Sequence, residues 1–146
     1  MNIPLVNLDL ERVQGPIEDA RGLPNHYYVT AEGYAQERDA VFGTSWAGVA
    51  FESDLPEKGS IFPVQLAGIP LLAVRDRQDE IRVFHNVCSH RGVALAEQPT
   101  TLMGMLCCPY HSWTYDLTGK LVATPHVGGI NTHQVEGLAC EEHGLK

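Results

Sequence analysis

The chain has 146 residues, of which 44% are hydrophobic, and its formal net charge at pH 7 is −8. This length predicts one main domain with a core of its own. No apolar run approaches the roughly 20 residues needed to cross a bilayer, and the N-terminus lacks the pattern of a secretory signal. The acidic balance argues against nucleic acid and anionic membranes, which need Lys and Arg clusters. We therefore expect a cytoplasmic protein with no nucleic-acid or membrane partner.

The N-terminal part is predicted to be an arm followed by a helix. Residues 1–29 show no sustained hydrophobic period and contain several Pro and Gly, which predicts an irregular arm with a short helical turn near residues 9–14. A helix is predicted over residues 31–42, because Thr30 can cap its start and Gly43 can end it.

Beyond residue 46, short runs rich in β-branched residues alternate with Gly and Asp turn signals. Strands this short predict a mostly β fold, a small antiparallel sandwich or barrel, rather than alternating βαβ units. The predicted strands cover residues 61–66, 70–75, 81–86, 106–108, 113–115 and 120–124.

Two segments combine cysteine and histidine at metal-ligand spacing: Cys88-Ser89-His90, and Cys108-Pro109-Tyr110-His111. Each segment follows a predicted strand and supplies one thiol and one imidazole, so the two can converge at one end of a small sheet. This set suits a two-iron cluster in which two thiolates hold one iron and two neutral imidazoles hold the other. The predicted cofactor and metal ligands are therefore Cys88, His90, Cys108 and His111.

Other readings of these residues remain open. Two cysteines and two histidines also suit tetrahedral zinc, although zinc fingers and ribbons usually begin with C-x2-4-C rather than C-x-H. A zinc-stabilised binding module is thus the alternative of a different class. A third reading, four unrelated residues, is disfavoured by the paired loops after strands. Cys107 is expected to be an inert buried thiol that points away from Cys108.

The motif surroundings resemble a known family. Residues 84–92 and 108–119 are similar to the two cluster loops of Rieske proteins. The upstream sequence over residues 37–76 resembles the large (alpha) subunits of ring-hydroxylating Rieske non-haem iron oxygenases. Respiratory-chain Rieske proteins carry an extra cysteine in each loop, where this chain has Val93 and Tyr110. The resemblance therefore places the chain in the lower-potential oxygenase branch.

The resemblance implies a Rieske-type sandwich with two cluster-binding loops and a [2Fe–2S] cofactor. It also implies one-electron transfer from a ferredoxin or flavin reductase to a mononuclear Fe(II) site in a catalytic domain, across a subunit interface. No further motif of two histidines and a carboxylate is present, so we expect an isolated electron-transfer domain that does not oxygenate substrate by itself. A free-standing Rieske ferredoxin is the alternative within the same class.

The domain prediction that follows is an arm and helix over 1–45, a Rieske domain over 46–130, and a tail over 131–146 that leads toward an absent catalytic domain. Three residues near the ligands carry further expectations. Trp113 and Tyr110 are expected to keep water off the cluster, and Ser112 stands where the family more often has glycine. His143 is expected to be a solvated histidine.

Overall fold

A computed structural model describes residues 13–132 and 142–146, and the chain divides into two compact units, Met1–Ala47 and Gly48–Lys146. The helical turn predicted near residues 9–14 lies largely outside the described residues. None of the described helices is long and apolar enough to cross a membrane.

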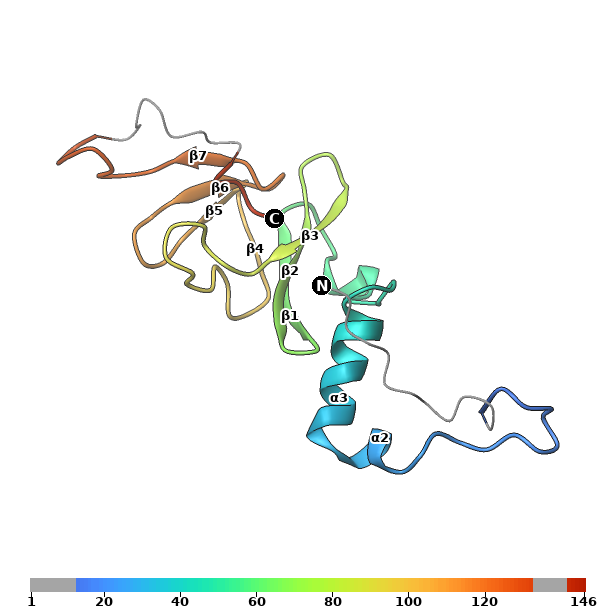
Figure 1. The fold of residues 1–146 in the computed structure, drawn as a ribbon. Helices are drawn as coiled ribbons and strands as arrows, with labels where there is room; N and C mark the ends of the chain where they lie inside the picture. The colour runs from blue at the N-terminus through green and yellow to red at the C-terminus, as the bar shows by residue number, and fades with distance from the viewer. Residues whose placement is uncertain (1–12, 133–141) are drawn as a thin grey trace. The chain divides into compact units, whose positions relative to one another are not determined.

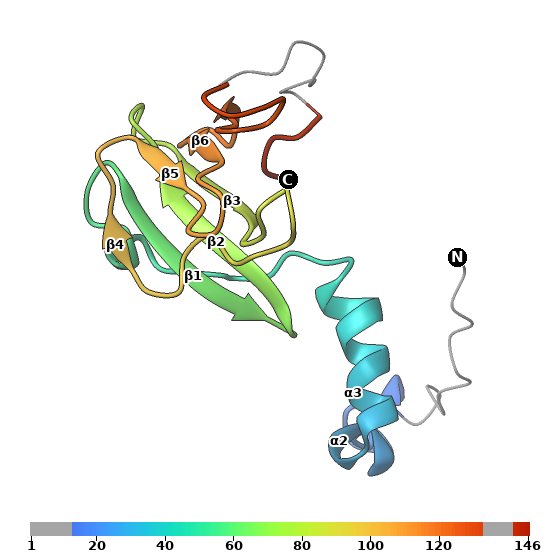
Figure 2. The ribbon, with the colours of Figure 1, turned by 90° about the vertical axis from the view of Figure 1, so that its left-hand side faces the viewer.

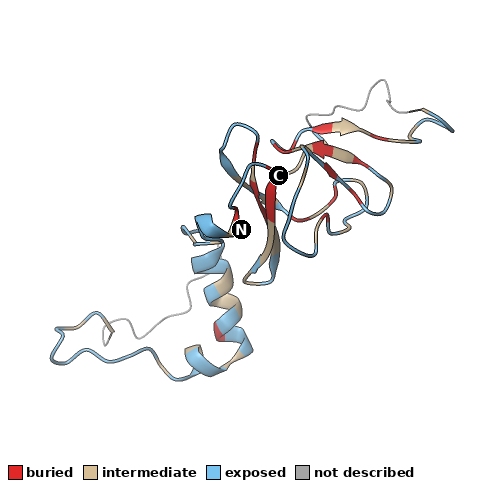
Figure 3. Cartoon of the chain, turned by 180° about the vertical axis from the view of Figure 1, so that it is seen from behind, coloured by how far each residue is buried: buried red, intermediate tan, exposed pale blue. Residues whose placement is uncertain are grey.

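The N-terminal unit is helical. It contains the short helix α2 (His26–Val29), the helix α3 (Ala31–Glu37) and a continuing π-helical turn, η1 (Arg38–Phe42). The helix predicted over residues 31–42 is confirmed, although its last turn has the wider π hydrogen bonding. Thr30 caps its start as predicted, because its hydroxyl accepts the N–H three residues on at 3.0 Å. Most of the described residues of this unit are exposed (Figure 3).

The second unit contains two antiparallel sheets, visible in Figures 1 and 2. The four-stranded sheet has the order β3-β2-β1-β4 and the three-stranded sheet the order β5-β6-β7. A 3-10 turn, η2 (Glu52–Asp54), precedes them. The strands are β1 (Ser60–Leu66), β2 (Ile69–Arg75), β3 (Ile81–His85), β4 (Thr100–Thr101), β5 (Met105–Cys107), β6 (Thr114–Asp116) and β7 (Leu121–Ala123).

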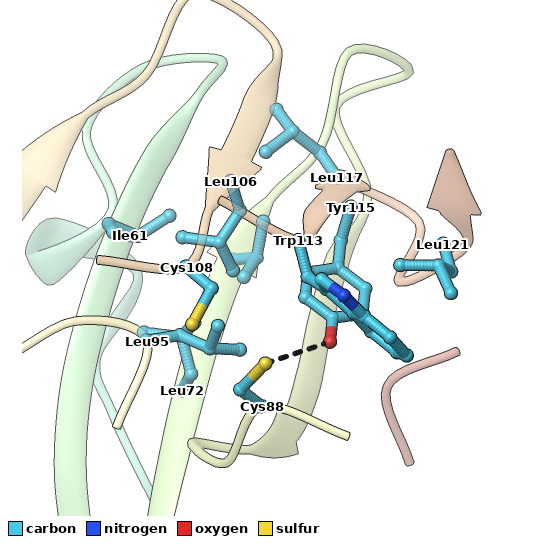
Figure 4. Packing of buried hydrophobic residues seen from close by; sticks show 11 residues of the cluster. Ile61, Leu72, Cys88, Leu95, Leu106, Cys108, Trp113, Tyr115, Leu117 and Leu121 are labelled. Atoms are coloured by element: carbon cyan, nitrogen blue, oxygen red, sulfur yellow. Dashed lines mark hydrogen bonds between the residues drawn. The ribbon is translucent and has the colours of Figure 1, made fainter. Parts of the chain in front are cut away.

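One hydrophobic core joins the two sheets. Ile61 and Leu72 from the first sheet pack in the same cluster as Leu106 and Tyr115 from the second (Figure 4). The mostly β antiparallel sandwich is therefore confirmed, and the described strands do not close into a barrel. Trp113 and both predicted ligand cysteines belong to this core, so the two segments predicted to bind metal lie where the two sheets meet.

A buried carboxylate closes the β2–β3 hairpin. Asp76 is fully buried and accepts hydrogen bonds from Arg82 Nε at 2.7 Å and from the backbone N–H groups of Gln78 and Glu80 at 2.8 and 3.0 Å. Burial by itself would raise the pKa of Asp76, but the hydrogen bond from Arg82 and those from the backbone outweigh it, so the pKa is lowered. Ionised Asp76 therefore stabilises the fold.

The unfolding free energy is expected to fall in acid because of Asp76. Its pKa is lower folded than unfolded, so its contribution is complete above about pH 4 and is lost as pH falls through the folded pKa. Asp76→Asn should lower the unfolding free energy by about 1–3 kcal/mol at pH 7. It should also make the unfolding free energy less dependent on pH in acid. Urea unfolding of both proteins between pH 2.5 and 7 measures this, and parallel pH profiles would contradict it.

Candidate metal centre

The first ligand segment is a tight loop that follows β3, and residues 86–93 are called loop 1 here. The Cys88 N–H donates to the Val93 carbonyl at 2.8 Å, and the Gly92 N–H donates to the Cys88 carbonyl at 2.9 Å. Gly92 has φ 73°, in the left-handed region that glycine adopts without strain. Loop 1 thus turns back within five residues of Cys88.

The second segment, residues 108–113 between β5 and β6, is called loop 2 and closes in the same way. The Cys108 N–H donates to the Trp113 carbonyl at 2.8 Å, and the Ser112 N–H donates to the Cys108 carbonyl at 3.0 Å. Ser112 has φ 56°, so it occupies in loop 2 the left-handed position that Gly92 occupies in loop 1. The two loops are therefore local structural equivalents, each presenting one cysteine and one histidine.

Asn86 ties the two ends of loop 1 together. Its side chain is buried, and its Oδ1 accepts the backbone N–H groups of Leu95 and Ala96 at 2.9 and 3.1 Å. Its Nδ2 donates to the Ala96 carbonyl at 2.7 Å. Three hydrogen bonds from one amide thus hold the segment that returns from loop 1, which fixes the backbone around Cys88.

The structure brings the four predicted ligands to one end of the sandwich. Cys88 and Cys108 are each 2% exposed, whereas His90 and His111 are half-buried. The two imidazole rings lie with their centroids 4.9 Å apart. Buried sulfurs next to partly exposed imidazoles form a compact centre with an apolar inner side and an outer side that reaches the surface.

One buried polar atom of loop 2, His111 Nδ1, fits a metal bound at this centre. Among the described residues, His111 Nδ1 and Trp113 Nε1 are the buried side-chain atoms without a hydrogen-bond partner, and both belong to loop 2. A buried imidazole nitrogen with a free lone pair is normally costly, but it is the state in which histidine binds a metal. The residues present therefore fit a metal cluster between the loops.

The ionisation of His90 favours metal binding, whereas that of Cys88 opposes it. Burial raises the pKa of the Cys88 thiol, and the neighbouring Cys108 thiol adds to the effect. Burial also lowers the pKa of His90, assisted by His111 and Arg91, which favours the neutral imidazole that binds metals. Metal binding would therefore displace the Cys88 thiol proton, whereas the His90 imidazole would already be neutral.

The number of ligands per metal ion separates a two-iron cluster from zinc. Within residues 13–132 and 142–146, no three His, Cys, Asp or Glu side chains gather closely enough to hold one metal ion. A tetrahedral zinc site needs four ligands on a single ion. A two-iron cluster with mixed ligation needs only two side chains on each iron.

A tyrosine hydroxyl faces the first thiol. Tyr115, on β6, is fully buried, and its Oη lies 3.2 Å from Cys88 Sγ, as the dashed line in Figure 4 shows. Burial, and then the contact with Cys88, raise the pKa of Tyr115 to about 12, so the phenol keeps its proton at neutral pH. Nothing in the sequence reveals that the Tyr115 hydroxyl reaches loop 1.

The fold agrees with that of known proteins. The family model of the Rieske [2Fe-2S] domain matches residues 45–134, which is more than half of the chain. The chain belongs to the Rieske family. Its relatives are oxygenase alpha subunits, as the sequence resemblance indicates.

Two relatives illustrate the range of the Rieske oxygenases. The glycine betaine monooxygenase oxygenase subunit of Chromohalobacter salexigens is 39% identical over 124 residues, which is 85% of this chain and 26% of that protein. The alpha subunit of biphenyl dioxygenase from Paraburkholderia xenovorans is 33% identical over 83% of this chain and 27% of that protein. The chain thus spans about a quarter of the length of these relatives.

Solved Rieske oxygenase structures share the fold. A quaternary ammonium Rieske monooxygenase in complex with gamma-butyrobetaine superposes with a TM-score of 0.75 at 28% identity, over 86% of this chain and 35% of that chain. Naphthalene 1,2-dioxygenase from Rhodococcus sp. gives a TM-score of 0.66 at 34% identity, over 70% of this chain and 23% of that chain.

Several residues of the Rieske domain differ from their sequence predictions. Trp113 is buried as expected and stacks on the His90 ring at 4.6 Å, but Tyr110 is 57% exposed and does not shield the core. Cys107 points away from Cys108 as expected, yet it is exposed rather than buried, because it shares with Met105 the face of β5 that is not covered. His143 is half-buried, with its ring edge-on to Trp113 at 6.1 Å.

Ser112→Gly is expected to stabilise the Rieske domain by about 0.5–1 kcal/mol, because glycine removes the left-handed strain that serine bears there. Gly92→Ser is the matched control at the equivalent position of loop 1, and it should destabilise by a similar amount. Denaturant unfolding measures both effects. A loss of stability in Ser112→Gly would show that the serine makes a compensating interaction.

Proposed function

We propose that this chain carries single electrons on a Rieske-type [2Fe–2S] cluster. The ligands are one cysteine and one histidine from each loop: Cys88, His90, Cys108 and His111. The observation that carries the proposal is the convergence of two buried thiols and two adjacent imidazoles from loops with the same backbone closure. When bound, such a cluster supplies a reversible one-electron couple between about −150 and +300 mV.

The residues around the ligands exclude water, orient one imidazole and leave one side open to an electron acceptor. The core keeps water away from the sulfurs of Cys88 and Cys108, and Trp113 holds the His90 ring in a fixed plane by stacking at an interplanar angle of 8°. The half-buried imidazoles form the side nearest the surface. Electrons would therefore leave through His90 and His111, where an acceptor can approach.

We place this electron transfer within an oxygenase alpha subunit. The donor would be a ferredoxin or flavin reductase, and the acceptor a mononuclear iron in a catalytic domain, in a neighbouring subunit. The similarity over 85% of this chain to oxygenase subunits supports this role. One related quaternary ammonium Rieske monooxygenase is described in terms of inter-subunit electron transfer. The N-terminal helical unit, which a minimal ferredoxin would not need, also favours this role over a free-standing ferredoxin.

The reaction of the parent oxygenase has two candidates. Ring hydroxylation follows from the resemblance of the loops and from relatives such as biphenyl dioxygenase. Oxidation of a quaternary ammonium compound is the second candidate. It is favoured by the higher identity to a glycine betaine monooxygenase subunit, 39% against 33%. The Rieske domain itself does the same work in both.

The test is an electron paramagnetic resonance spectrum of the dithionite-reduced protein, with iron, zinc and sulfide measured on the same sample. We expect two irons and two sulfides per chain, and a rhombic signal whose average g lies well below that of all-cysteine ferredoxins. A colourless sample without this signal and with one zinc per chain would overturn the proposal in favour of a zinc-stabilised module.

A further inference from the structure

Ser89, the residue between the loop 1 ligands, takes part in a short chain of polar contacts. Its Oγ lies 2.9 Å from Tyr115 Oη and donates to the His143 carbonyl at 2.6 Å. The Ser89 backbone N–H also donates to Tyr115 Oη at 3.1 Å. Because Tyr115 Oη is 3.2 Å from Cys88 Sγ, the contacts run continuously from the thiol to the carbonyl.

The C-terminal segment that supplies this carbonyl is held on the Rieske domain. The Leu145 N–H donates to the Gly119 carbonyl at 2.7 Å, and the His85 N–H donates to the Lys146 carbonyl at 2.6 Å. The Leu145 side chain packs, partly buried, against the core. These contacts therefore hold the His143 carbonyl in place as a hydrogen-bond acceptor.

The protons available do not suffice for every contact. Once Cys88 is a metal-bound thiolate it has no proton to give, and a carbonyl never has one. The hydroxyls of Ser89 and Tyr115 thus supply two protons for three contacts: thiolate to phenol, phenol to serine, and serine to carbonyl. One of these contacts must be without a proton at any moment.

The shortest of the three contacts indicates which of them lacks a proton. The Ser89 proton goes to the His143 carbonyl at 2.6 Å, so Ser89 Oγ presents only lone pairs to Tyr115 Oη. The Tyr115 proton can relieve the repulsion between the two oxygens only by turning toward Ser89. When it does so, the Cys88 sulfur loses its hydrogen bond.

We propose that Ser89, with its own proton committed to the His143 carbonyl, lowers the reduction potential of the bound cluster by drawing the Tyr115 proton away from the Cys88 sulfur. The inference rests on the proposed function. Its physical basis is that reduction adds a negative charge to the cluster, so a hydrogen bond to a cluster sulfur favours the reduced form. Ser89 is thus a positioning residue that sets the potential without touching the metal.

The test is a redox titration of the cluster-loaded protein, followed by its paramagnetic signal. Ser89 is exposed, so Ser89→Ala leaves the core intact, and it should raise the reduced-to-oxidised ratio at a fixed ambient potential severalfold. For comparison, a tenfold change corresponds to about 59 mV for one electron. Ser89→Thr keeps the hydroxyl and should therefore have the wild-type reduction potential. An unchanged or lower potential in Ser89→Ala would overturn the inference.

A double-mutant cycle shows whether the effect passes through the phenol. Tyr115→Phe removes the hydroxyl proton that Cys88 and Ser89 compete to accept, and it should lower the reduction potential. In that background Ser89→Ala should have no further effect, whereas an equal rise in both backgrounds would refute the route through Tyr115. If the wild-type protein lacked the two-iron signal, the proposed function itself would fail, so the two failures are distinguishable.

Discussion

Cys108→Ser is expected to abolish cluster binding, with iron and sulfide content reduced more than about tenfold. Serine has nearly the shape of cysteine, but its hydroxyl stays protonated at neutral pH and is a poor ligand for iron. Cys108 is 2% exposed and lies in a loop held by its own backbone hydrogen bonds, so the substitution should leave the loop backbone in place. Iron and sulfide analysis with visible absorption measures the loss.

Cys107→Ser is the matched control, one residue earlier in the chain. Cys107 is exposed on edge strand β5 and points away from the core, so this variant should keep the full cluster content and the wild-type spectrum. Thermal unfolding and circular dichroism establish that both variants are folded. Cluster loss in Cys107→Ser, or retention in Cys108→Ser, would show that the ligand assignment of loop 2 is wrong.

Gly59→Ala is expected to lower the unfolding free energy by about 2–5 kcal/mol. Gly59 has φ 95°, where an alanine is strained, and a Cβ there would overlap the carbonyl oxygen of Leu102. The overlap has no simple escape, because the Leu102 N–H also donates to the Gly59 carbonyl at 2.8 Å. This close approach is what brings β4 alongside β1.

Gly68→Ala separates backbone strain from steric overlap, the two causes of the stability loss in Gly59→Ala. Gly68 also has a positive φ, 83°, in the two-residue turn between β1 and β2, but open space surrounds the position of its Cβ. Only the backbone strain remains, so the expected loss is about 1–2 kcal/mol. Urea unfolding compares the variants, and equal losses would mean that the contact with Leu102 relaxes without cost.

The elements that position the candidate metal centre could be predicted from the sequence because their signals are local. The runs at 61–66 and 70–75 match β1 and β2 to within a residue, since β-branched residues and a two-residue turn determine such a hairpin. Loop 1 and loop 2 could be predicted from ligand spacing after strands. Their closeness in space follows from the antiparallel sandwich.

The remaining features depend on contacts between residues distant in the sequence. Strand β4 has only two residues, Thr100 and Thr101, and exists because Gly59 allows their approach to β1. The role of Ser89 is invisible in its own segment, because its partners lie 26 and 54 positions away. His143 was expected to be solvated for the same reason, since its neighbour Trp113 lies on a different element.

Loop 1 and loop 2 extend from different sheets of the sandwich. Loop 1 follows β3 of the four-stranded sheet, whereas loop 2 joins β5 to β6 of the other sheet. A cofactor bound to both loops would act as a cross-link that closes the chain between Cys88 and His111 into a ring, worth about 3 kcal/mol by analogy with a disulfide. Cofactor occupancy would then set the lifetime of the protein as well as its redox function. Copies whose cluster is lost to oxidation would be the first to unfold and to be degraded.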